Sequence, residues 1–353
     1  MEIAVFDAVT ASEEERRAWH ALDSVINRER GGEDNVRPYA ESMARQLHPG
    51  ARVAYHWVMW DDAREQVVGE SRLMWWKTSD DLSVADFDVM VRPDLRRQGL
   101  AARLLGPVLE KARMEGRTLL GGESVGGHES GAAFLAWLGA EQRMVSRRSL
   151  LRTADVDREL LRSWVGRAPE RATGYSLVGW RGPCPDELLG EYVCVKEVMN
   201  TAPKEDLQIG DDRFDEALIR ELEADAAARS SELWTLCARR DATGELVGIT
   251  QLALSSWWPQ RAFQEDTGVG PAHRDRGLGR WLKATLMLEL LDERPDVEVV
   301  ETWNAGSNAA MLGINVAMGF RPAQEWAVWQ VATDAAAERI GEHLMNSRRV
   351  PSR

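Results

Sequence analysis

Hydrophobic and polar positions along the first half of the chain predict helices first and a strand hairpin next. The pattern over residues 12–47 is typical of helical segments on either side of a break at Gly31 and Gly32. Strand-like apolar runs follow at 52–60 and 66–76, with a polar turn between them. We therefore expect helices that precede an antiparallel pair of strands.

The second half of the chain repeats this order. A helix is expected over 213–229, where apolar residues recur at helical spacing. Strands are expected over 234–239 and 246–254, and the Asp-Ala-Thr-Gly sequence between them is typical of a hairpin turn. The two halves therefore begin with the same elements.

Each half then continues with a strand, a helix, a short strand, a helix and a final strand. We expect these elements over 87–91, 100–115, 118–121, 129–138 and 144–151 in the first half, and over 263–269, 278–291, 298–302, 308–318 and 326–331 in the second. The order predicts an α+β (layered α/β) fold, in which each half has a mixed, mostly antiparallel sheet flanked by helices.

One motif repeats without a gap. Residues 91–101 align with residues 269–279, which lie 178 positions later, so the repeat has the length of a domain. We therefore expect tandem domains. The expected boundaries are 1–152 for the first domain, 153–174 for a helix and linker, 175–333 for the second domain and 334–353 for a C-terminal helix and tail.

Composition excludes several classes of partner. The net charge of −13 argues against nucleic-acid binding and favours cationic small molecules such as amines. The three cysteines form no Cys-x-x-Cys pair and the six histidines have no metal-ligand spacing, so we expect a reducing compartment and no metal. The N-terminus lacks the features of a signal peptide, and no apolar run is long enough to span a bilayer. These features predict a cytoplasmic protein without a membrane partner.

The repeated motif carries the chemistry. In each copy a strand ends at Val-x-Pro, and Arg-x-x-Gly-x-Gly/Ala then opens a helix. Free N–H groups at a helix N-terminus bind phosphate oxygens, and small residues let the backbone approach a pyrophosphate closely. A single copy is more often a glycine turn before a packed helix, but two copies in matching contexts favour a phosphate site. We call residues 96–101 the first glycine loop and residues 274–279 the second glycine loop.

An Asn-bearing helix and a Gly-Phe pair follow the repeated motif. With these elements, nearly the whole chain resembles the GNAT acetyltransferase superfamily. The second half is the fuller copy and is similar to tandem GNAT proteins of actinobacteria, with mycothiol synthase as a distant relative. The resemblance implies acetyl-CoA as co-substrate, with its pyrophosphate on the glycine loops and its acetyl carbonyl near Val269 or Val91, where adjacent strands splay apart. The cofactor-binding residues that it implies are Val269, Arg274, Arg276, Gly277, Leu278, Gly279, Asn304 and Asn308 in the second half, and Val91, Arg96, Gly99 and Ala101 in the first.

The catalytic groups are less clearly marked. Many family members have a tyrosine acid where this chain has Asn315 in one half and Leu135 in the other. The candidate bases are Asp266, Glu265 and Glu301, and Asp266 is preferred because Asp88 repeats it in the first half. Each of these acids could instead be a solvated strand residue, and a water-mediated base is also possible in this chemistry.

The first half departs further from the family pattern. Pro107 falls inside its phosphate-binding helix, and His128 replaces the motif asparagine. We therefore expect the main site in the second half, and a first half that binds the cofactor weakly or serves as scaffold. The fifteen tryptophans offer apolar area for packing between the halves, which predicts a monomer with an internal pseudo-dimer, or a homodimer.

The function expected from these observations is acetyl-CoA-dependent N-acetyl transfer to the primary amine of a small molecule, by direct attack in a ternary complex. Two alternatives remain. One is a non-catalytic acyl-CoA-binding sensor or scaffold of the same fold, and the other is a protein or peptide N-acetyltransferase.

Overall fold

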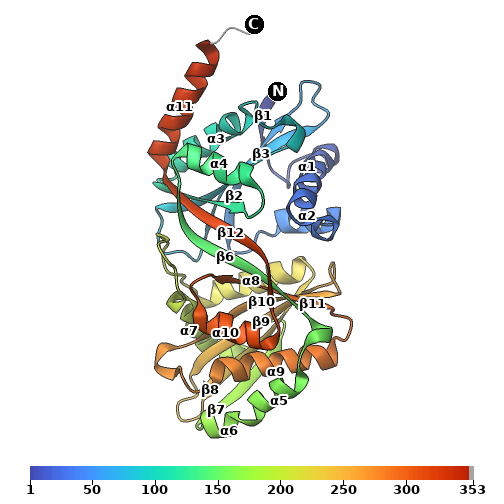
Figure 1. Ribbon diagram of the computed structural model, residues 1–353, viewed down its shortest axis with the longest axis vertical. Coiled ribbons are helices and arrows are strands. Elements are labelled where there is room, and N and C mark those ends of the chain that lie inside the picture. The colour runs from blue at the N-terminus through green and yellow to red at the C-terminus, as the bar shows by residue number, and fades with distance from the viewer. Residues whose placement is uncertain (350–353) are drawn as a thin grey trace. The chain divides into compact units, whose positions relative to one another are not determined.

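The computed structural model describes residues 1–349 and divides them into two compact units (Figure 1). The first unit contains Met1–Met144, Asp206–Gly210 and the chain from Trp326 onward, and the second contains Val145–Glu205 and Asp211–Glu325. Each unit is a mixed sheet flanked by helices, which confirms the predicted α+β tandem architecture.

In the first unit the strands lie in the order β1-β2-β3-β4-β5-β12. Neighbours are antiparallel except for β4 and β5, which are parallel. The strands are β1 (Glu2–Phe6), β2 (Arg52–Trp60), β3 (Val67–Trp76), β4 (Val84–Val91), β5 (Leu119–Val125) and β12 (Arg321–Ala332), and the helices are α1 (Glu13–Gly31), α2 (Tyr39–Leu47), α3 (Leu100–Met114), α4 (Glu129–Leu138) and α11 (Thr333–Arg349), with short 3₁₀ turns at Glu33–Asn35 and Pro93–Leu95.

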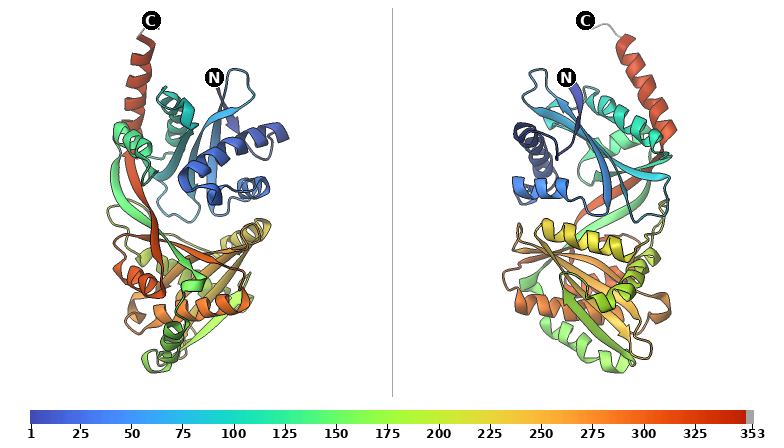
Figure 2. Two further views of the ribbon diagram at one scale, coloured as in Figure 1. Left: turned by 45° about the vertical axis from the view of Figure 1, so that its right-hand side comes forward. Right: turned by 180° about the vertical axis from the view of Figure 1, so that it is seen from behind.

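Alternation along the strands gives this sheet two buried faces. On β2, Val58 and Trp60 pack with α1 and α2, whereas Trp57 packs on the opposite face with α3, α4 and α11. Figure 2 shows helices on both faces of each sheet. The local sequence also stabilises the first turn of α1, because Ser12 and Glu15 form a reciprocal capping box at its N-terminus.

In the second unit the strands lie in the order β6-β11-β10-β9-β8-β7, and only β10 and β11 are parallel. The strands are β6 (Glu141–Arg152), β7 (Tyr175–Arg181), β8 (Ser231–Arg240), β9 (Leu246–Ser255), β10 (Arg261–Val269) and β11 (Val299–Ala305). The helices are α5 (Arg158–Gly166), α6 (Ala168–Arg171), α7 (Leu189–Lys196), α8 (Glu216–Ala228), α9 (Leu278–Glu293) and α10 (Ala309–Met318), with 3₁₀ turns at Thr153–Asp155, Asp186–Leu188, Glu197–Thr201 and Pro271–His273.

The final strands of the two halves are exchanged. Strand β6 follows α4 of the first half but pairs with β11, and β12 follows α10 of the second half but pairs with β5. The packing units therefore differ from the expected domains 1–152 and 175–333, which follow the order of the sequence. The two copies have equivalent final strands, so either strand can complete either sheet, as in domain swapping.

The helix expected within 153–174 is α5, and the residues after it include the short helix α6 and Ala172, which is buried in the core of the second unit. Pro107 lies inside α3, which runs without interruption from Leu100 to Met114. The expected C-terminal helix is α11, and the last four residues of that segment lie outside the described residues.

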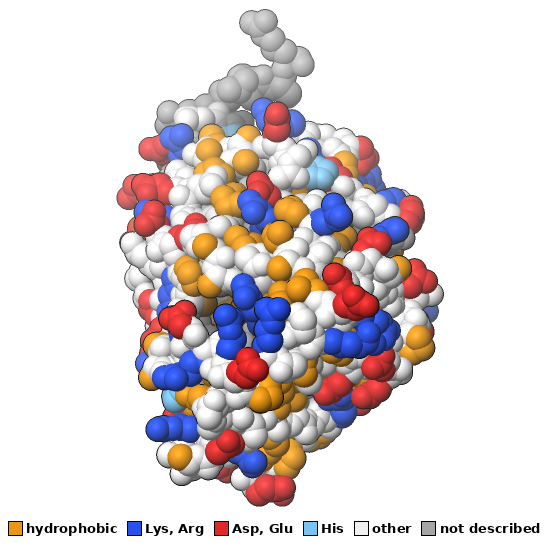
Figure 3. Space-filling model, turned by 60° about the horizontal axis from the view of Figure 1, so that its bottom comes forward, with side chains coloured by type: hydrophobic (Ala, Val, Ile, Leu, Met, Phe, Trp, Pro, Cys, Tyr) orange, Lys and Arg blue, Asp and Glu red, His pale blue; other side chains and the backbone are white. Residues whose placement is uncertain are grey.

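Charged side chains of both signs cover the surface. On the face shown in Figure 3, acidic and basic side chains are interspersed with hydrophobic ones. Many of the surface carboxylates pair with arginine, as Asp292 does with Arg158 at 2.5 Å and Asp296 with Arg294 at 2.8 Å. Within residues 1–349 no helix is long and apolar enough to cross a membrane.

Candidate functional site

The two glycine loops have the same backbone conformation. Gly99 and Gly277 adopt left-handed φ angles of 76° and 79° immediately before α3 and α9, and Arg97 and Asp275 adopt φ angles of 65° and 63° two residues earlier. Glycine is the residue that tolerates this conformation at the helix start without strain. Each loop therefore presents the free N–H groups of a helix N-terminus, which is a geometry that binds anions.

The arginines of the loops fasten the loops to the preceding strands. Arg96 donates from Nε to the carbonyl of Val91 at 3.0 Å, and its other nitrogens form a bidentate pair with Glu29 at 2.5 and 2.7 Å. The hydrogen bond from Arg96 holds the pKa of Glu29 below its usual range. Arg274 likewise donates to the carbonyl of Val269 at 3.0 Å. These arginines shape the loops, and the charge of Arg96 is already neutralised.

In both units the parallel strands separate before they reach the glycine loop. Strands β4 and β5 pair only as far as Asp86 and Gly121, and β10 and β11 pair only as far as Gln264 and Thr302. Strand β10 also carries an irregularity between Gln264 and Thr267, whereas the β3–β4 pairing shows no shift. Glu265 and Asp266 are therefore the bulge residues of β10.

A cavity of about 550 Å³ occupies the split in the first unit. It extends from the diverging strands β4 and β5 to the first glycine loop, and its walls include α4 and the C-terminal helix α11. Its lining includes Asp88, Val91, Arg96, Gly99, Ala101, Glu123, Phe134 and His343. This is the half in which the sequence predicted the weaker site, and the ranking of the two sites stays a prediction.

Glu123 on β5 is the candidate base of this cavity. The side chain of Glu123 is partly open to solvent, but protein atoms surround its carboxyl group on several sides. The resulting loss of hydration, together with the charges of Asp88 and Asp86, raises the pKa of Glu123 to about 7. Within residues 1–349 its carboxylate makes no hydrogen bond or ion pair. A solvent-accessible carboxyl group with a pKa near neutrality can accept a proton at physiological pH.

The neighbouring acids in the first unit differ from Glu123. Asp88 pairs with Arg72 at 3.3 Å, and Arg72 pairs with the buried Glu70 at 2.9 Å. The indole of Trp19 also donates to Glu70 at 2.9 Å. Burial, reinforced by the charge of Asp88, raises the pKa of Asp86 to about 6. One guanidinium is therefore shared by two carboxylates, and the position of Asp88 is fixed by a buried network.

The acids predicted in the second unit are paired with cations or lie on the bulge. Asp266 forms an ion pair with Lys196 of α7, which raises the pKa of that lysine. Glu301 is buried and accepts hydrogen bonds from Arg148 at 2.7 Å and from the Trp303 indole at 3.1 Å. Glu265 is exposed to solvent. Asp266 and Glu301 therefore each have a cationic partner already in place.

The asparagines predicted in the second half have local partners. Asn308 caps α10 by accepting from the N–H of Met311 at 3.2 Å. Asn304 accepts at 2.7 Å from Asn315, the residue at the position of the expected tyrosine acid. Asn315 is buried, and its own side-chain oxygen has no hydrogen-bond partner within residues 1–349.

The remaining predicted positions of the second loop are structural or exposed. Leu278 is buried in the core of the second unit, whereas Arg276 is exposed. A methyl group at Gly279 would lie 3.5 Å from Ile314, an ordinary packing distance, so α9 lies against α10 at this position. Val91 is buried beneath the first loop, and Ala101 packs beside it.

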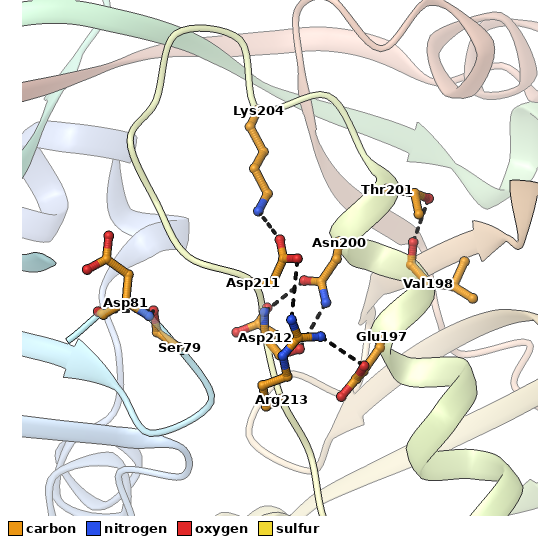
Figure 4. Close-up of polar contacts among 10 residues, drawn as sticks. All are labelled: Ser79, Asp81, Glu197, Val198, Asn200, Thr201, Lys204, Asp211, Asp212 and Arg213. Atoms are coloured by element: carbon orange, nitrogen blue, oxygen red, sulfur yellow. Dashed lines mark hydrogen bonds and ion pairs between the residues drawn. The ribbon is translucent and has the colours of Figure 1, made fainter. Parts of the chain in front are cut away.

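The segment after α7 covers the end of β10. A methyl group at Gly268 would lie 3.0 Å from Val198 and 3.1 Å from Met199. The segment is held by Asn200, whose side chain exchanges hydrogen bonds of 2.9 and 2.8 Å with the backbone of Asp212 (Figure 4).

Known proteins share parts of this sequence and fold. The model of the acetyltransferase (GNAT) family matches residues 197–320. The solved structure of a tandem GNAT protein from the clavulanic acid biosynthesis pathway, without AcCoA, is 27% identical with a TM-score of 0.75, and the alignment covers 94% of this chain and 98% of that one. The chain carries a GNAT acetyltransferase domain and has the tandem GNAT fold.

More distant structures share the tandem GNAT fold only. A GCN5-related N-acetyltransferase from Sphaerobacter thermophilus is 12% identical with a TM-score of 0.64, over 94% of this chain and 95% of that one. A glucosamine N-acetyltransferase region of a fungal multi-domain enzyme is 13% identical with a TM-score of 0.65, over 94% of this chain and 38% of that one. None of the curated proteins compared with the chain matches it significantly.

Sequence reasoning missed Glu123 and His343 as residues of the cavity in the first unit. The predicted strand 118–121 stopped short of Glu123, although β5 continues to Val125. His343 lies on the C-terminal helix α11, which the sequence predicted without a role in a site. Within residues 1–349 no group of three or more His, Cys, Asp or Glu side chains could hold a metal ion.

Proposed function

We propose that this tandem GNAT protein transfers the acetyl group of acetyl-CoA to the primary amine of a small molecule, and that the reaction takes place in the first unit. The observation that carries the proposal is the cavity that joins the split between β4 and β5 to the first glycine loop. Its volume of about 550 Å³ lies within the range of about 300–1,000 Å³ that is usual for small-ligand sites.

The backbone supports the donor end of this proposal. The N–H groups at the start of α3 would bind the diphosphate of acetyl-CoA, because they are free and lie at the positive end of the helix dipole. Beyond Asp86 the edge of β4 is no longer paired with β5. Backbone N–H groups on that edge, near Val91, would stabilise the oxyanion that forms when the thioester carbonyl is attacked.

Glu123 would prepare the acceptor. A primary amine is mostly protonated near pH 7 and must lose a proton before it can attack. The Glu123 carboxylate would take that proton, and the neutral nitrogen would then form a bond to the carbonyl carbon. The acidic side chains of Asp88 and Glu123 in the cavity wall would attract a cationic acceptor.

The thiol leaving group needs little assistance. When the tetrahedral species collapses, the carbon–sulfur bond breaks, the thiolate of CoA leaves, and the nitrogen gives up its second proton to water. A thiol has a pKa of about 8.5, so the thiolate can depart and take a proton from Glu123 or from water. This accommodates Leu135 at the position of the usual tyrosine.

The experiment compares Glu123→Gln with Asp266→Asn in an assay of CoA release over a panel of small amines. If the reaction takes place in the first unit, kcat/KM falls by about 10²–10⁴ in Glu123→Gln and by less than threefold in Asp266→Asn. The reverse result supports the competing site in the second half, with Asp266, Glu265 or Glu301 as base. Tight acetyl-CoA binding without turnover of any amine favours the sensor function over the enzyme.

Two further proposals accompany this function. Both glycine loops have the conformation expected of a cofactor loop, so we propose a second acetyl-CoA site on residues 274–279. A cytoplasmic location also stays a proposal, and the three free thiols of Cys184, Cys194 and Cys237 are compatible with a reducing compartment.

A further inference from the structure

In each unit, the segment that follows the exchanged strand lies antiparallel to the helix that begins at the glycine loop. In the second unit, Arg158 at the start of α5 pairs with Asp292 at the end of α9 at 2.5 Å. Toward the other end of the same helices, the guanidinium of Arg280 lies 5.4 Å from the ring of Trp164. The chain after β6 therefore runs toward the second glycine loop.

The first unit repeats this arrangement with α11. Asp334 at the start of α11 accepts a hydrogen bond from Arg113 at the end of α3 at 2.9 Å. Ala336 and Ile340 are buried against the α3 side of the core. Helix α11 is therefore docked along α3, and its later residues approach the first glycine loop.

This packing places a basic side chain at the same point of both loops. A methyl group at Gly99 would lie 3.6 Å from Nε2 of His343, and a methyl group at Gly277 would lie 3.7 Å from Cδ of Arg171. The two basic residues come from unrelated segments, α11 and α6, and yet each meets the glycine that precedes the helix. A basic group beside the free N–H groups of a helix start strengthens a site for phosphate.

His343 is held in place and faces the cavity. Its ring packs edge-on against Trp137 of α4, with centroids 5.2 Å apart. Arg339, one turn earlier on α11, donates to the carbonyl of Trp137 at 2.9 Å. His343 itself contributes to the cavity wall at the glycine-loop end. The charge of Arg96 is neutralised by Glu29, and His343 joins Arg97 of the same loop as a basic side chain in the cavity wall.

We infer that the exchanged segments complete the two cofactor sites: His343 donates a hydrogen bond to the diphosphate of acetyl-CoA on the first loop, and Arg171 does so on the second. The inference rests on the proposed function, because it takes acetyl-CoA as the ligand. Each site then includes a residue from the segment beyond an exchanged strand, so neither half of the sequence alone contains a complete site.

The test on the first loop measures binding of CoA and of 3′-phospho-ADP, a fragment with the diphosphate and without pantetheine, by calorimetry. His343→Leu keeps bulk against Trp137 and removes the donor, and His343→Gln keeps a donor. We expect His343→Leu to weaken both ligands about tenfold, which is about 1.4 kcal/mol, and His343→Gln to bind within about threefold of the wild type. Glu342→Ala, a change at the neighbouring exposed residue of α11, is the control and should bind at least as tightly as the wild type.

Other outcomes separate the inference from the proposed function. A wild-type chain that binds no CoA refutes the proposed function itself. A His343→Leu variant that binds both ligands like the wild type, or that loses CoA but not the fragment, overturns the role of His343. On the second loop, Arg171→Met should weaken a second site while Arg162→Met, on the same segment, should not. A chain with both His343→Leu and Arg171→Met that binds CoA normally overturns the whole inference.

Discussion

The pH dependence of catalysis gives the sharpest test of Glu123. Burial and the charges of Asp88 and Asp86 raise its pKa to about 7. About 10% of the side chain is then ionised at pH 6 and about 90% at pH 8. Because only the ionised form accepts a proton, kcat/KM should rise about ninefold between these pH values. It should then stay level until the acceptor amine begins to lose its own proton.

Glu123→Gln keeps the shape of the side chain and removes its basicity. We expect kcat/KM to fall by about 10²–10⁴ at pH 7.5 and the inflection near pH 7 to disappear. In this variant only the free amine can react, so the rate should rise about tenfold per pH unit up to the pKa of the amine. The assay is the initial rate of thiol release from acetyl-CoA between pH 5.5 and 9.5, with an amine whose pKa lies above 9.

Asp88→Asn provides the matched comparison. Asp88 is a cause of the raised pKa of Glu123, so its replacement should move the inflection to lower pH while the step itself remains. An inflection that persists near pH 7 in Glu123→Gln would refute the assignment of Glu123 as base, whatever the size of the loss in rate.

Three further variants test other parts of the structure. Asp266→Asn should leave kcat/KM within threefold, because Lys196 already holds that carboxylate as an ion pair, and a loss of about 10² or more would place the base in the second unit. Gly99→Val puts a branched side chain at φ 76° beside His343, so calorimetry should show weaker acetyl-CoA binding, and unchanged affinity would exclude this loop as the site. Lys283→Leu should stabilise the fold by a few kcal/mol at pH 7, because burial lowers the pKa of Lys283 from 10.5 to about 7 and its charging on unfolding therefore favours the unfolded chain. In the wild type this penalty fades as the pH rises from 7 to 10.5, so the gain in melting temperature should shrink over the same range, and a constant gain would contradict the explanation.

Much of the fold could be predicted from local sequence. The order of helices and strands follows from apolar patterning, and the repeat of Arg-x-x-Gly-x-Gly/Ala correctly identified both helix starts that carry left-handed glycines. The exchange of β6 and β12 could not be predicted in this way. A strand pattern states that a segment pairs, but its partner is chosen by contacts far away in sequence. Since both halves end in equivalent strands, the pattern alone favours neither sheet.

The candidate bases show the same limit at the level of charge. Asp266 and Glu301 are recognisable as strand acids, but their cationic partners lie 70 and 153 residues away in the sequence. An ion pair of this kind determines which group a carboxylate faces, and no local motif reveals it. Glu123 was missed for the complementary reason: its raised pKa comes from its surroundings in the folded state.

Comparison of the two copies supports Glu123 over Asp266. Asp88 and Asp266 recur at the same place in the repeat, which first favoured them as catalytic, yet both form an ion pair with a cation from a neighbouring element, Arg72 in one unit and Lys196 in the other. The feature that both copies share is therefore an ion pair on the strand before the glycine loop, β4 in one unit and β10 in the other. Helices α4 and α10 end at Gly139 and Gly319, which lie 180 residues apart. The same spacing aligns Glu123 with Trp303, so Glu123 has no acidic counterpart in the second copy. In a duplicated fold the shared residues are those that both copies need for the common scaffold, whereas chemistry that belongs to one copy must rest on residues that the other copy lacks. Glu123, open to the cavity of the first unit, meets that condition, and Asp266 does not.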